Sequence, residues 1–268
     1  MLIADLAGFA LVFFIGVIMG TIGAGGSILT SAVLVYVFCI SPVLSASYTL
    51  LNVCTISIIG FVQYYRKGLV DINMGLLYAL PTLLMVFCMR RFIMPAIPDI
   101  IFSNERFTIT KNLLVMLAFS LLMITIAWSM IRRPVYTPAV NQKRPSSFVM
   151  ILPGIFTGLL TGFAGAGGGF VIVPALVFFG GLEIKKAIGT SLFIIAINTS
   201  TGFIGDYSAG VNYDWFFLIK LVAATVAGMV LSGRIMVKMS NEKLRRLFAY
   251  TILTMGCWVI IRELWLRS

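Results

Sequence analysis

The sequence predicts an all-α polytopic membrane protein built from two inverted-topology repeats, each a glycine-broken helix hairpin followed by three transmembrane helices. Three observations predict this fold. The composition is that of an integral membrane protein, two glycine-rich stretches recur in matching surroundings, and the apolar segments fall into two sets of five. Each set begins with a glycine-rich stretch, so we expect one structural unit to be used twice.

The composition sets the class of protein. Of the 268 residues, 60% are hydrophobic and 11% are charged, and the mean hydropathy is +1.05, whereas a soluble domain is about half apolar and about a quarter charged. We interpret the net charge of +11 as Lys and Arg in short loops that set orientation, so a lipid bilayer is the expected partner and no nucleic acid is. The chain has no histidine, and its four cysteines lack metal-ligand spacing. We therefore expect no cofactor, no metal site and no enzymatic activity.

The first repeat covers residues 1–131. Its apolar segments span 6–21, 27–40, 43–65, 73–94 and 111–131. At about 1.5 Å per residue the first two do not comfortably cross a bilayer core of about 30 Å, so we interpret them as half-helices that meet at the glycine break. An insertion from Pro95 to Lys111 precedes the last segment and has no equivalent in the second repeat.

The second repeat covers residues 148–268 and follows a linker at 132–147, whose prolines and charges predict an exposed connection. Its apolar segments span 148–163, 169–181, 184–205, 214–237 and 246–265. Between Gly16 and Asp71 a shift of 142 residues superposes the two copies without a gap, so that Gly20 meets Gly162 and Tyr65 meets Tyr207. Because neither half is expected to bury its own backbone break, we expect the two repeats to form one fold unit.

The distribution of Lys and Arg predicts the orientation. Each hairpin returns the chain to the side it left and three further segments cross, so the second repeat is upside down relative to the first. Thirteen basic residues then lie on one side: Arg66, Lys67, Arg132, Arg133, Lys143, Arg144, Lys185, Lys186, Arg234, Lys238, Lys243, Arg245 and Arg246. Seven lie on the other: Arg90, Arg91, Arg106, Lys111, Lys220, Arg262 and Arg267. The positive-inside rule makes the first side cytoplasmic, which predicts a multi-pass plasma-membrane protein with the linker inside and both termini outside.

The glycine-rich stretches form the first part of the candidate site. Glycine favours non-helical backbone, which inside a bilayer is tolerated where protein buries it or where it lines a cavity. Helices that begin near Gly26 and Gly168 would each present free N–H groups and about half a positive charge, which can hold a small oxyanion without a cationic side chain. The candidate substrate-binding residues here are Gly23, Gly25, Gly26, Ser27, Gly165, Gly167, Gly168 and Gly169.

Polar side chains in the segment after each break form the second part of the candidate site. The candidates are Tyr48, Asn52, Thr190, Ser191 and Asn198. Their hydroxyl and amide groups can donate hydrogen bonds to oxyanion oxygens. For a hydroxyl the alternative is a bond to the carbonyl one turn earlier or to a neighbouring helix. Asn52 and Asn198 differ by 146 residues, so they stand one helical turn out of register in the repeat.

Two further patterns carry expectations about packing and coupling. Gly16-x-x-x-Gly20 and Gly154-x-x-x-Gly158-x-x-x-Gly162 permit close approach of helices in lipid, and we expect them to pack within the hairpins. The nine carboxylates all lie at segment ends or in loops. Proton coupling through an acid at the membrane midplane is therefore not indicated.

Several motifs together carry a resemblance to a known family. The paired glycine stretches, Ala187-Ile188-Gly189-Thr190-Ser191-Leu192 and Tyr207-x-x-Gly210 resemble the TauE/SafE sulfite-exporter family of membrane transporters, over nearly the whole chain. The second repeat is the better match, because Ser27, Ala32 and Tyr48-Thr49 depart from the pattern in the first. The resemblance implies export of sulfite, sulfonates or other small sulfur-containing or organic anions.

The expected function is that of a secondary transporter, and more specifically an exporter, for such small anionic solutes. Half-helix ends directed at a midplane site within inverted repeats recur in secondary transporters. An anion channel or facilitator of the same architecture is the alternative, because the sequence does not separate a carrier from a channel. The sequence also leaves homo-oligomer formation open.

Overall fold

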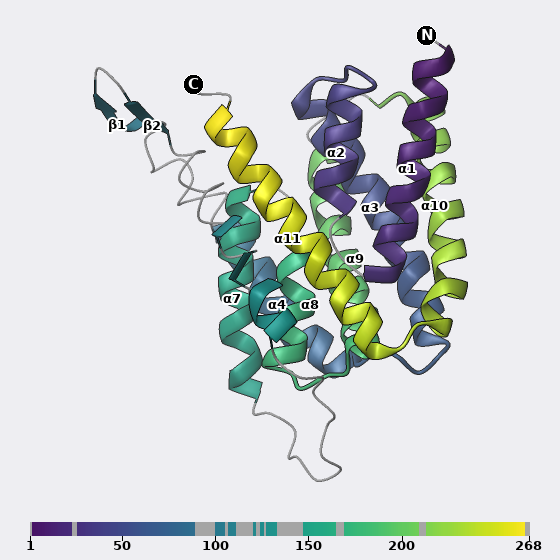
Figure 1. Cartoon of the computed structure of the whole chain (residues 1–268), viewed down its shortest axis with the longest axis vertical. Coiled ribbons are helices and arrows are strands. Elements are labelled where there is room, and N and C mark those ends of the chain that lie inside the picture. The colour runs from purple at the N-terminus through teal and green to yellow at the C-terminus, as the bar shows by residue number, and fades with distance from the viewer. Residues whose placement is uncertain are drawn as a thin grey trace.

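Helices dominate the part of the chain that the computed structural model describes. The described residues are 2–22, 26–88, 100–104, 107–110, 120–121, 124–125, 127–132, 147–164, 169–208 and 213–265. Figure 1 shows a bundle in which helices from the two halves of the chain alternate in space. The described membrane part is helical, as predicted.

The first half contains four labelled helices. They are α1 (Leu2–Ile22), α2 (Gly26–Tyr36), α3 (Pro42–Tyr65) and α4 (Ile72–Cys88). Helix α3 begins at a proline, whose fixed φ suits the first helical turn and whose missing N–H costs nothing there. A short antiparallel hairpin of β1 (Ile100–Asn104) and β2 (Phe107–Thr110) follows. This hairpin lies within the insertion, where β-branched and aromatic residues favour strands, and it departs from the all-α prediction.

The second half repeats the helical order. Its helices are α7 (Ser147–Ala164), α8 (Gly169–Phe178), α9 (Ile184–Ser208), α10 (Trp215–Lys238) and α11 (Asn241–Trp265). Three helices contain segments long and apolar enough to cross a membrane, namely Leu44–Tyr65, Ile184–Ile204 and Trp215–Gly233. Shorter apolar helical segments occupy Leu6–Thr21, Ile72–Cys88 and Met150–Leu159. The described part of the chain is thus an integral membrane bundle.

The two arms of each glycine-broken hairpin differ in length, which corrects the prediction of two half-helices. Helices α1 and α7 have 21 and 18 residues, whereas α2 and α8 have 11 and 10. Only the second arm is therefore a half-helix. The first arms continue to the glycine stretch, and α7 does so with Pro153 inside it. The buried Tyr64 hydroxyl donates to the Gly20 carbonyl at 2.8 Å, which satisfies a carbonyl in the last turn of α1.

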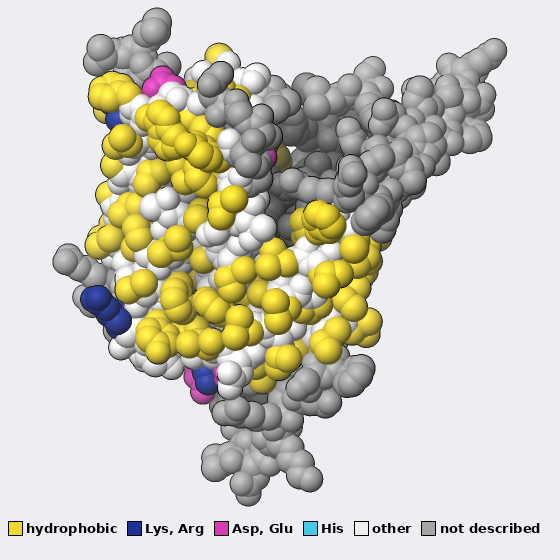
Figure 2. Space-filling model, turned by 180° about the vertical axis from the view of Figure 1, so that it is seen from behind, with side chains coloured by type: hydrophobic (Ala, Val, Ile, Leu, Met, Phe, Trp, Pro, Cys, Tyr) yellow, Lys and Arg dark blue, Asp and Glu magenta, His cyan; other side chains and the backbone are white. Residues whose placement is uncertain are grey.

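The bundle has two ends that can be told apart in Figure 1. Helices α1, α3 and α10 begin at the upper end of that view, and α4, α9 and α11 begin at its lower end. The start of α1 and the end of α11 both lie at the upper end. Figure 2 shows hydrophobic side chains over most of the face seen there, with the visible charged side chains near its margins. This distribution is what a surrounding bilayer requires.

Helices α3 and α9 form an antiparallel pair at the centre of the bundle. At the upper end the Ser47 hydroxyl donates to the Asp206 carboxylate at 2.6 Å. Midway, the Cys54 Sγ and Ser200 Oγ lie 3.1 Å apart. Farther down, the rings of Phe61 and Phe193 are 5.0 Å apart. Residue numbers rise along α3 as they fall along α9, so the two helices run in opposite directions.

The glycine spacings serve contacts between the two halves of the chain, which corrects the expectation of packing within the hairpins. A Cβ on Gly16 of α1 would lie 2.1 Å from the Thr225 carbonyl oxygen of α10. A Cβ on Gly158 of α7 would lie 2.7 Å from the Thr82 carbonyl oxygen of α4. The glycine spacing predicts that another helix approaches closely. In the structure that helix is the fourth helix of the other half, which is α10 for α1 and α4 for α7.

The turns that follow the two half-helices have matching hydrogen bonds. Ile40 N–H donates to the Leu34 carbonyl at 3.0 Å, and Leu182 N–H donates to the Leu176 carbonyl at 3.2 Å. Each residue of the first pair precedes its counterpart by the same 142 positions. Between them, Gly181 has a φ of 61° and its counterpart Cys39 has a φ of 53°. Cys39 therefore holds a left-handed backbone conformation that glycine adopts without strain.

We predict that Cys39→Gly stabilises the protein. Removing the Cβ relieves the left-handed strain, and we expect a gain of about 1 kcal/mol in the free energy of unfolding. The measurement is thermal unfolding of detergent-purified protein. Gly181→Cys is the matched control and should destabilise by a similar amount. A lower melting temperature for Cys39→Gly than for the wild type would contradict the account of the turn.

We also predict that Gly16→Ala destabilises the bundle, because the added Cβ meets backbone oxygen 2.1 Å away. The expected loss is about 1–3 kcal/mol, the usual cost of overpacking, measured by the same thermal assay. Gly202→Ala is the control, because its Cβ would meet only the flexible Leu50 side chain at 3.3 Å. If Gly16→Ala and Gly202→Ala had the same melting temperature, close packing of α1 on α10 would not limit the stability of the protein.

Candidate functional site

The starts of the two half-helices form the backbone part of the site. Helix α2 begins at Gly26 and α8 begins at Gly169, close to the predicted starts at Gly26 and Gly168. Their first N–H groups have no acceptor within their own helix. Ser27 lies in the first turn of α2. The other predicted glycines, Gly23, Gly25, Gly165, Gly167 and Gly168, lie outside the described residues.

Two of the predicted polar residues hold other helices in place. The Tyr48 hydroxyl accepts a hydrogen bond from the Asp214 N–H at 2.8 Å. The Thr190 hydroxyl accepts one from the Asp71 N–H at 2.9 Å. Both side chains are buried, at 3% and 0% exposure. Since each hydroxyl still has a proton to donate, these bonds limit but do not abolish a role in ligand binding.

Several hydroxyls on α9 bond to their own helix. Thr199 donates to the Ile195 carbonyl at 2.7 Å and Ser200 to the Ala196 carbonyl at 2.6 Å. Ser191, one of the predicted site residues, donates to the Ile188 carbonyl at 2.8 Å. The alternative reading, in which such hydroxyls serve the carbonyl one turn earlier, is confirmed for these residues. They leave the two asparagines as the distinctive polar groups.

Asn52 is fully buried on α3. Its Oδ1 accepts a hydrogen bond from the Thr225 hydroxyl of α10 at 2.9 Å. Its Nδ2 has no hydrogen-bond partner among the described residues. Thr225 was not singled out by sequence reasoning, although it stands opposite Thr82 when the fourth helices of the repeats are aligned at an offset of 143 residues. Asn52 therefore keeps a free N–H₂ donor while its oxygen is fixed.

Asn198 is the other distinctive polar side chain, and it lies within the membrane-spanning segment Ile184–Ile204 of α9. Both its Nδ2 and its Oδ1 are shielded from solvent and have no hydrogen-bond partner in the described structure. Leaving a buried polar group unpaired costs about 1–3 kcal/mol. A side chain that bears this cost in the middle of a membrane helix is a candidate for ligand binding.

The depth of Asn52 matches the start of α2. The Ser31 and Ser45 hydroxyls are 3.2 Å apart, which fixes the level of α2 on the antiparallel α3. Gly26 lies about 7.5 Å before Ser31 along its helix, and Asn52 lies about 10.5 Å after Ser45. Because seven residues are nearly two full turns, Asn52 and Ser45 share one face of α3. Asn52 thus stands near the level where α2 begins, and its side chain is bonded to Thr225 of α10.

The two asparagines lie away from the interface between α3 and α9. Asn52 contacts α10, not α9. Asn198 is two residues from Ser200, whose hydroxyl contacts Cys54 of α3, and two residues turn a side chain by about 200°. Each asparagine therefore points away from the partner helix of the α3–α9 pair. The convergence of both on one ligand stays a prediction.

Three further buried hydroxyls were not among the candidate site residues. Thr30, Thr49 and Ser57 have side-chain oxygens without a hydrogen-bond partner in the described part of the chain. Thr30 follows the start of α2, and Thr49 lies one turn before Asn52. Together with Asn52 they make this part of the bundle unusually polar for its depth. The sequence shows many hydroxyl side chains close to the glycines. It does not show which of these hydroxyls form hydrogen bonds and which do not.

The upper end of the α3–α9 pair carries a carboxylate surrounded by aromatic rings. Asp206 accepts from Ser47, and Tyr213 stacks on Tyr48 with ring centroids 5.8 Å apart. Burial, followed by the negative charge of Asp206, raises the pKa of Tyr213 above its ordinary value. This tyrosine therefore stays protonated and neutral at physiological pH.

The sulfite exporter TauE/SafE family model matches residues 8–259. The chain belongs to the TauE/SafE family. This match covers all the helices of both halves apart from their outermost residues, and it establishes the protein as a membrane transporter in class. The resemblance carried by the glycine stretches is thereby confirmed.

Curated relatives of this TauE/SafE protein have matching names. A "Probable membrane transporter protein" of Xylella fastidiosa (strain 9a5c) is 28% identical over 93% of this chain and 92% of its own. "Probable membrane transporter protein YdhB" of Bacillus subtilis (strain 168) is 25% identical over 83% of this chain and 86% of its own. No solved structure matches the chain. These names indicate a transporter and state no substrate.

We predict that Asn198→Leu stabilises the protein, because it removes two buried unpaired atoms at nearly constant volume. The expected gain in the free energy of unfolding is about 1–3 kcal/mol, measured by thermal unfolding without ligand. Asn52→Leu is the comparison, and its gain should be smaller because Thr225 loses a partner. A destabilised Asn198→Leu would show that the amide has structural partners after all.

Proposed function

We propose that this TauE/SafE protein is a secondary transporter, working as an exporter, for small oxyanions such as sulfite or sulfonates, which it binds where α2 and α8 begin. The observation that carries the proposal is the pair of buried amides on Asn52 and Asn198 whose N–H groups have no partner among the described residues. An oxyanion supplies the acceptors that these donors lack. The family description names sulfite, and that chemistry fits such donors.

Matching contacts between the halves support an inverted repeat. A Cβ on Gly60 would meet Leu192, and a Cβ on Gly202 would meet Leu50. Shifting each residue by 142 positions exchanges these two contacts. The packing of α1 on α10 is likewise exchanged with that of α7 on α4. Because α3 and α9 are antiparallel, a twofold axis that exchanges them lies across the helices, which is the relation that inverts one half.

The same equivalence supports a second half-site at α8. Helices α8 and α9 are joined by the same turn hydrogen bonds as α2 and α3. Residue 194 of α9 is the equivalent of Asn52, and Asn198 lies one turn farther along the same face. Each half-helix start then has one asparagine on the facing side of the next helix.

The donors at both half-sites are neutral. Each half-helix start contributes about half a positive charge, and the amides add hydrogen bonds. Described Lys and Arg side chains lie towards the helix ends, as with Arg66 and Lys67 after α3 and Lys220 near the start of α10. A small anion would be bound by dipoles and amides, which hold it without the strong attraction that would prevent release.

The charges also support an orientation. Arg66, Lys67, Lys185, Lys186 and Lys243 all lie at the lower end, beside the starts of α4, α9 and α11. We propose that this end is cytoplasmic, by the positive-inside rule, so that both termini lie outside the plasma membrane. The repeats 1–131 and 148–268 then form one transport unit joined by a cytoplasmic linker.

We predict that purified protein in liposomes moves sulfite or sulfoacetate and that Asn52→Leu and Asn198→Leu each reduce the flux. The loss should be about tenfold or more, since a hydrogen bond to a charged group is worth about 1.5–3 kcal/mol. The measurement is uptake of radiolabelled anion driven by unlabelled anion inside. Saturable counterflow indicates a carrier, whereas single-channel currents would indicate the channel alternative.

The control is Thr201→Val, which removes an exposed hydroxyl that bonds only to the Ile197 carbonyl within the described structure. It should leave the flux unchanged. Wild-type protein that moves neither these anions nor acetate, or asparagine variants that transport as well as Thr201→Val, would overturn the proposed site.

A further inference from the structure

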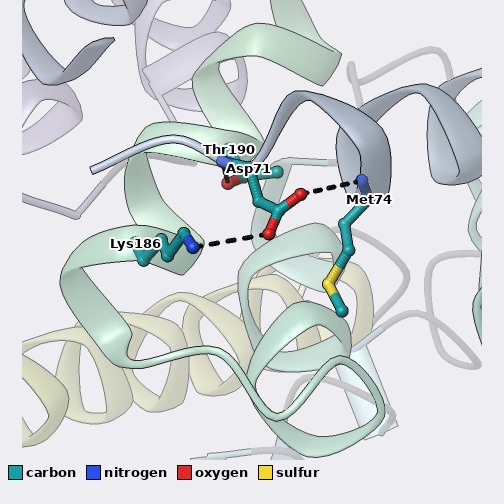
Figure 3. A network of polar contacts seen from close by, with 4 residues as sticks. All are labelled: Asp71, Met74, Lys186 and Thr190. Carbon is teal, nitrogen blue, oxygen red and sulfur yellow. Dashed lines mark hydrogen bonds and ion pairs between the residues drawn. The ribbon is translucent and has the colours of Figure 1, made fainter. Parts of the chain in front are cut away.

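A polar network ties the start of α4 to the start of α9 at the lower end (Figure 3). The Asp71 carboxylate accepts from the Met74 N–H at 3.1 Å, which caps α4, and the Asp71 N–H donates to the Thr190 hydroxyl. The second oxygen of the same carboxylate lies 3.4 Å from the Lys186 ammonium group. One residue, Asp71, thus joins two helices from different halves of the chain.

The upper end has the equivalent network around Asp214. Its carboxylate accepts from the Phe217 N–H at 3.1 Å, which caps α10. Its N–H donates to the Tyr48 hydroxyl on α3 at 2.8 Å. Tyr48 precedes Thr190 by 142 positions, so the hydroxyls that accept these bonds are repeat equivalents. Both ends therefore use a capping aspartate to hold the fourth helix of one half on the third helix of the other.

The two networks differ in one charge. The position equivalent to Lys186 is occupied by Leu44, which packs among hydrophobic side chains. Within the described residues Asp214 forms no ion pair, whereas Asp71 has Lys186. The Asp71 side chain is only 15% exposed and that of Lys186 is 38% exposed. The pair is therefore partly desolvated and less screened than an exposed surface pair.

The stability of Lys186 at this position depends on its contact with Asp71. Lys186 lies in the first turn of α9, where the helix dipole disfavours a cation. The carboxylate of Asp71 offsets that cost as long as the start of α4 stays against α9. Separating the two helices leaves the lysine at a positive helix end without its partner, so the ion pair favours the closed arrangement of this end.

We propose that Asp71 and Lys186 form an ion-pair latch that holds the lower end closed, and that the upper end has the same helix contact without the latch. Both residues are positioning residues, which set the balance between two arrangements of the bundle without touching the solute. The inference rests on the transport function and on the repeat equivalence proposed above. It predicts that weakening the latch opens the lower end and closes the upper one.

The test uses cysteine accessibility in sealed vesicles and needs no transported solute. Met74→Cys reports the first turn of α4, and its repeat equivalent Phe217→Cys reports that of α10, each in a protein whose native cysteines are replaced. The readout is the rate of modification by a membrane-impermeant maleimide added from the side that each reporter faces. Lys186→Leu should raise the Met74→Cys rate about two- to fivefold, the range expected for such an ion pair, and should lower the Phe217→Cys rate.

Matched variants separate the latch from other effects. Lys185→Leu removes the neighbouring charge and should change neither rate. Asp71→Asn keeps the capping oxygen but loses the charge, so it should reproduce the effect of Lys186→Leu, and the double variant should add nothing. Raising the salt from about 0.01 M to about 1 M shortens the screening length from about 30 Å to about 3 Å, so it should shift the wild type towards Lys186→Leu and leave that variant unchanged.

Three results would overturn the latch. They are unchanged rates in Lys186→Leu, an equal effect from Lys185→Leu, and a faster Met74→Cys reaction with no change at Phe217→Cys, which would mean local fraying of α4. Thermal unfolding of each variant checks that it is folded. Because no anion is present, failure here leaves the proposed oxyanion transport untouched, and failure of the transport assay leaves this result valid.

Discussion

The antiparallel packing of α3 against α9 is the interaction on which the rest of the structure depends. It places Ser47 beside Asp206 at one end and Tyr64 beside Gly189 at the other. Every other large contact between the halves is arranged around it, with α1 on α10 at one side and α4 on α7 at the other. A bilayer supplies no water to satisfy exposed backbone, so the ends of the half-helices must be covered by this shared framework.

That framework explains how the chain tolerates two helix interruptions in a membrane. The last turn of α1 is partly satisfied by Tyr64, and hydroxyls such as Thr199 serve their own helix. What remains unsatisfied among the described residues is concentrated on Asn52, Asn198 and a few buried hydroxyls. Each such group costs about 1–3 kcal/mol when it stays unpaired, and the proposed binding of a solute rich in acceptors would offset that cost.

The sequence predicted the helix starts and the family, because glycine register and apolar periodicity are local properties. It did not predict which helices contact each other. The spacing around Gly16 predicted a close helix contact but did not identify α10 as the contacting helix. Tyr48 and Thr190 were correctly selected as special polar residues, yet their hydroxyls hold Asp214 and Asp71. Those bonds link residues more than a hundred positions apart, and only the repeat equivalence of Tyr48 and Thr190 could have suggested them.

The two halves differ at equivalent positions in backbone conformation and in charge. Cys39 keeps a backbone conformation that its equivalent Gly181 adopts without strain, and Leu44 stands where Lys186 carries a charge. The first half also departs more from the family pattern at its glycine stretch. The two ends of the bundle thus share helix contacts and differ in one ion pair.

The most direct measurement is an anomalous difference map at the selenium edge from crystals soaked in selenite, which shares the shape and charge of sulfite. The account predicts a peak within hydrogen-bonding distance of the first N–H groups of α2 or α8 and of the Asn52 or Asn198 amide. Selenite bound only at lysines and arginines of the helix ends, with the half-helix starts empty at a concentration that stabilises the protein, would contradict it.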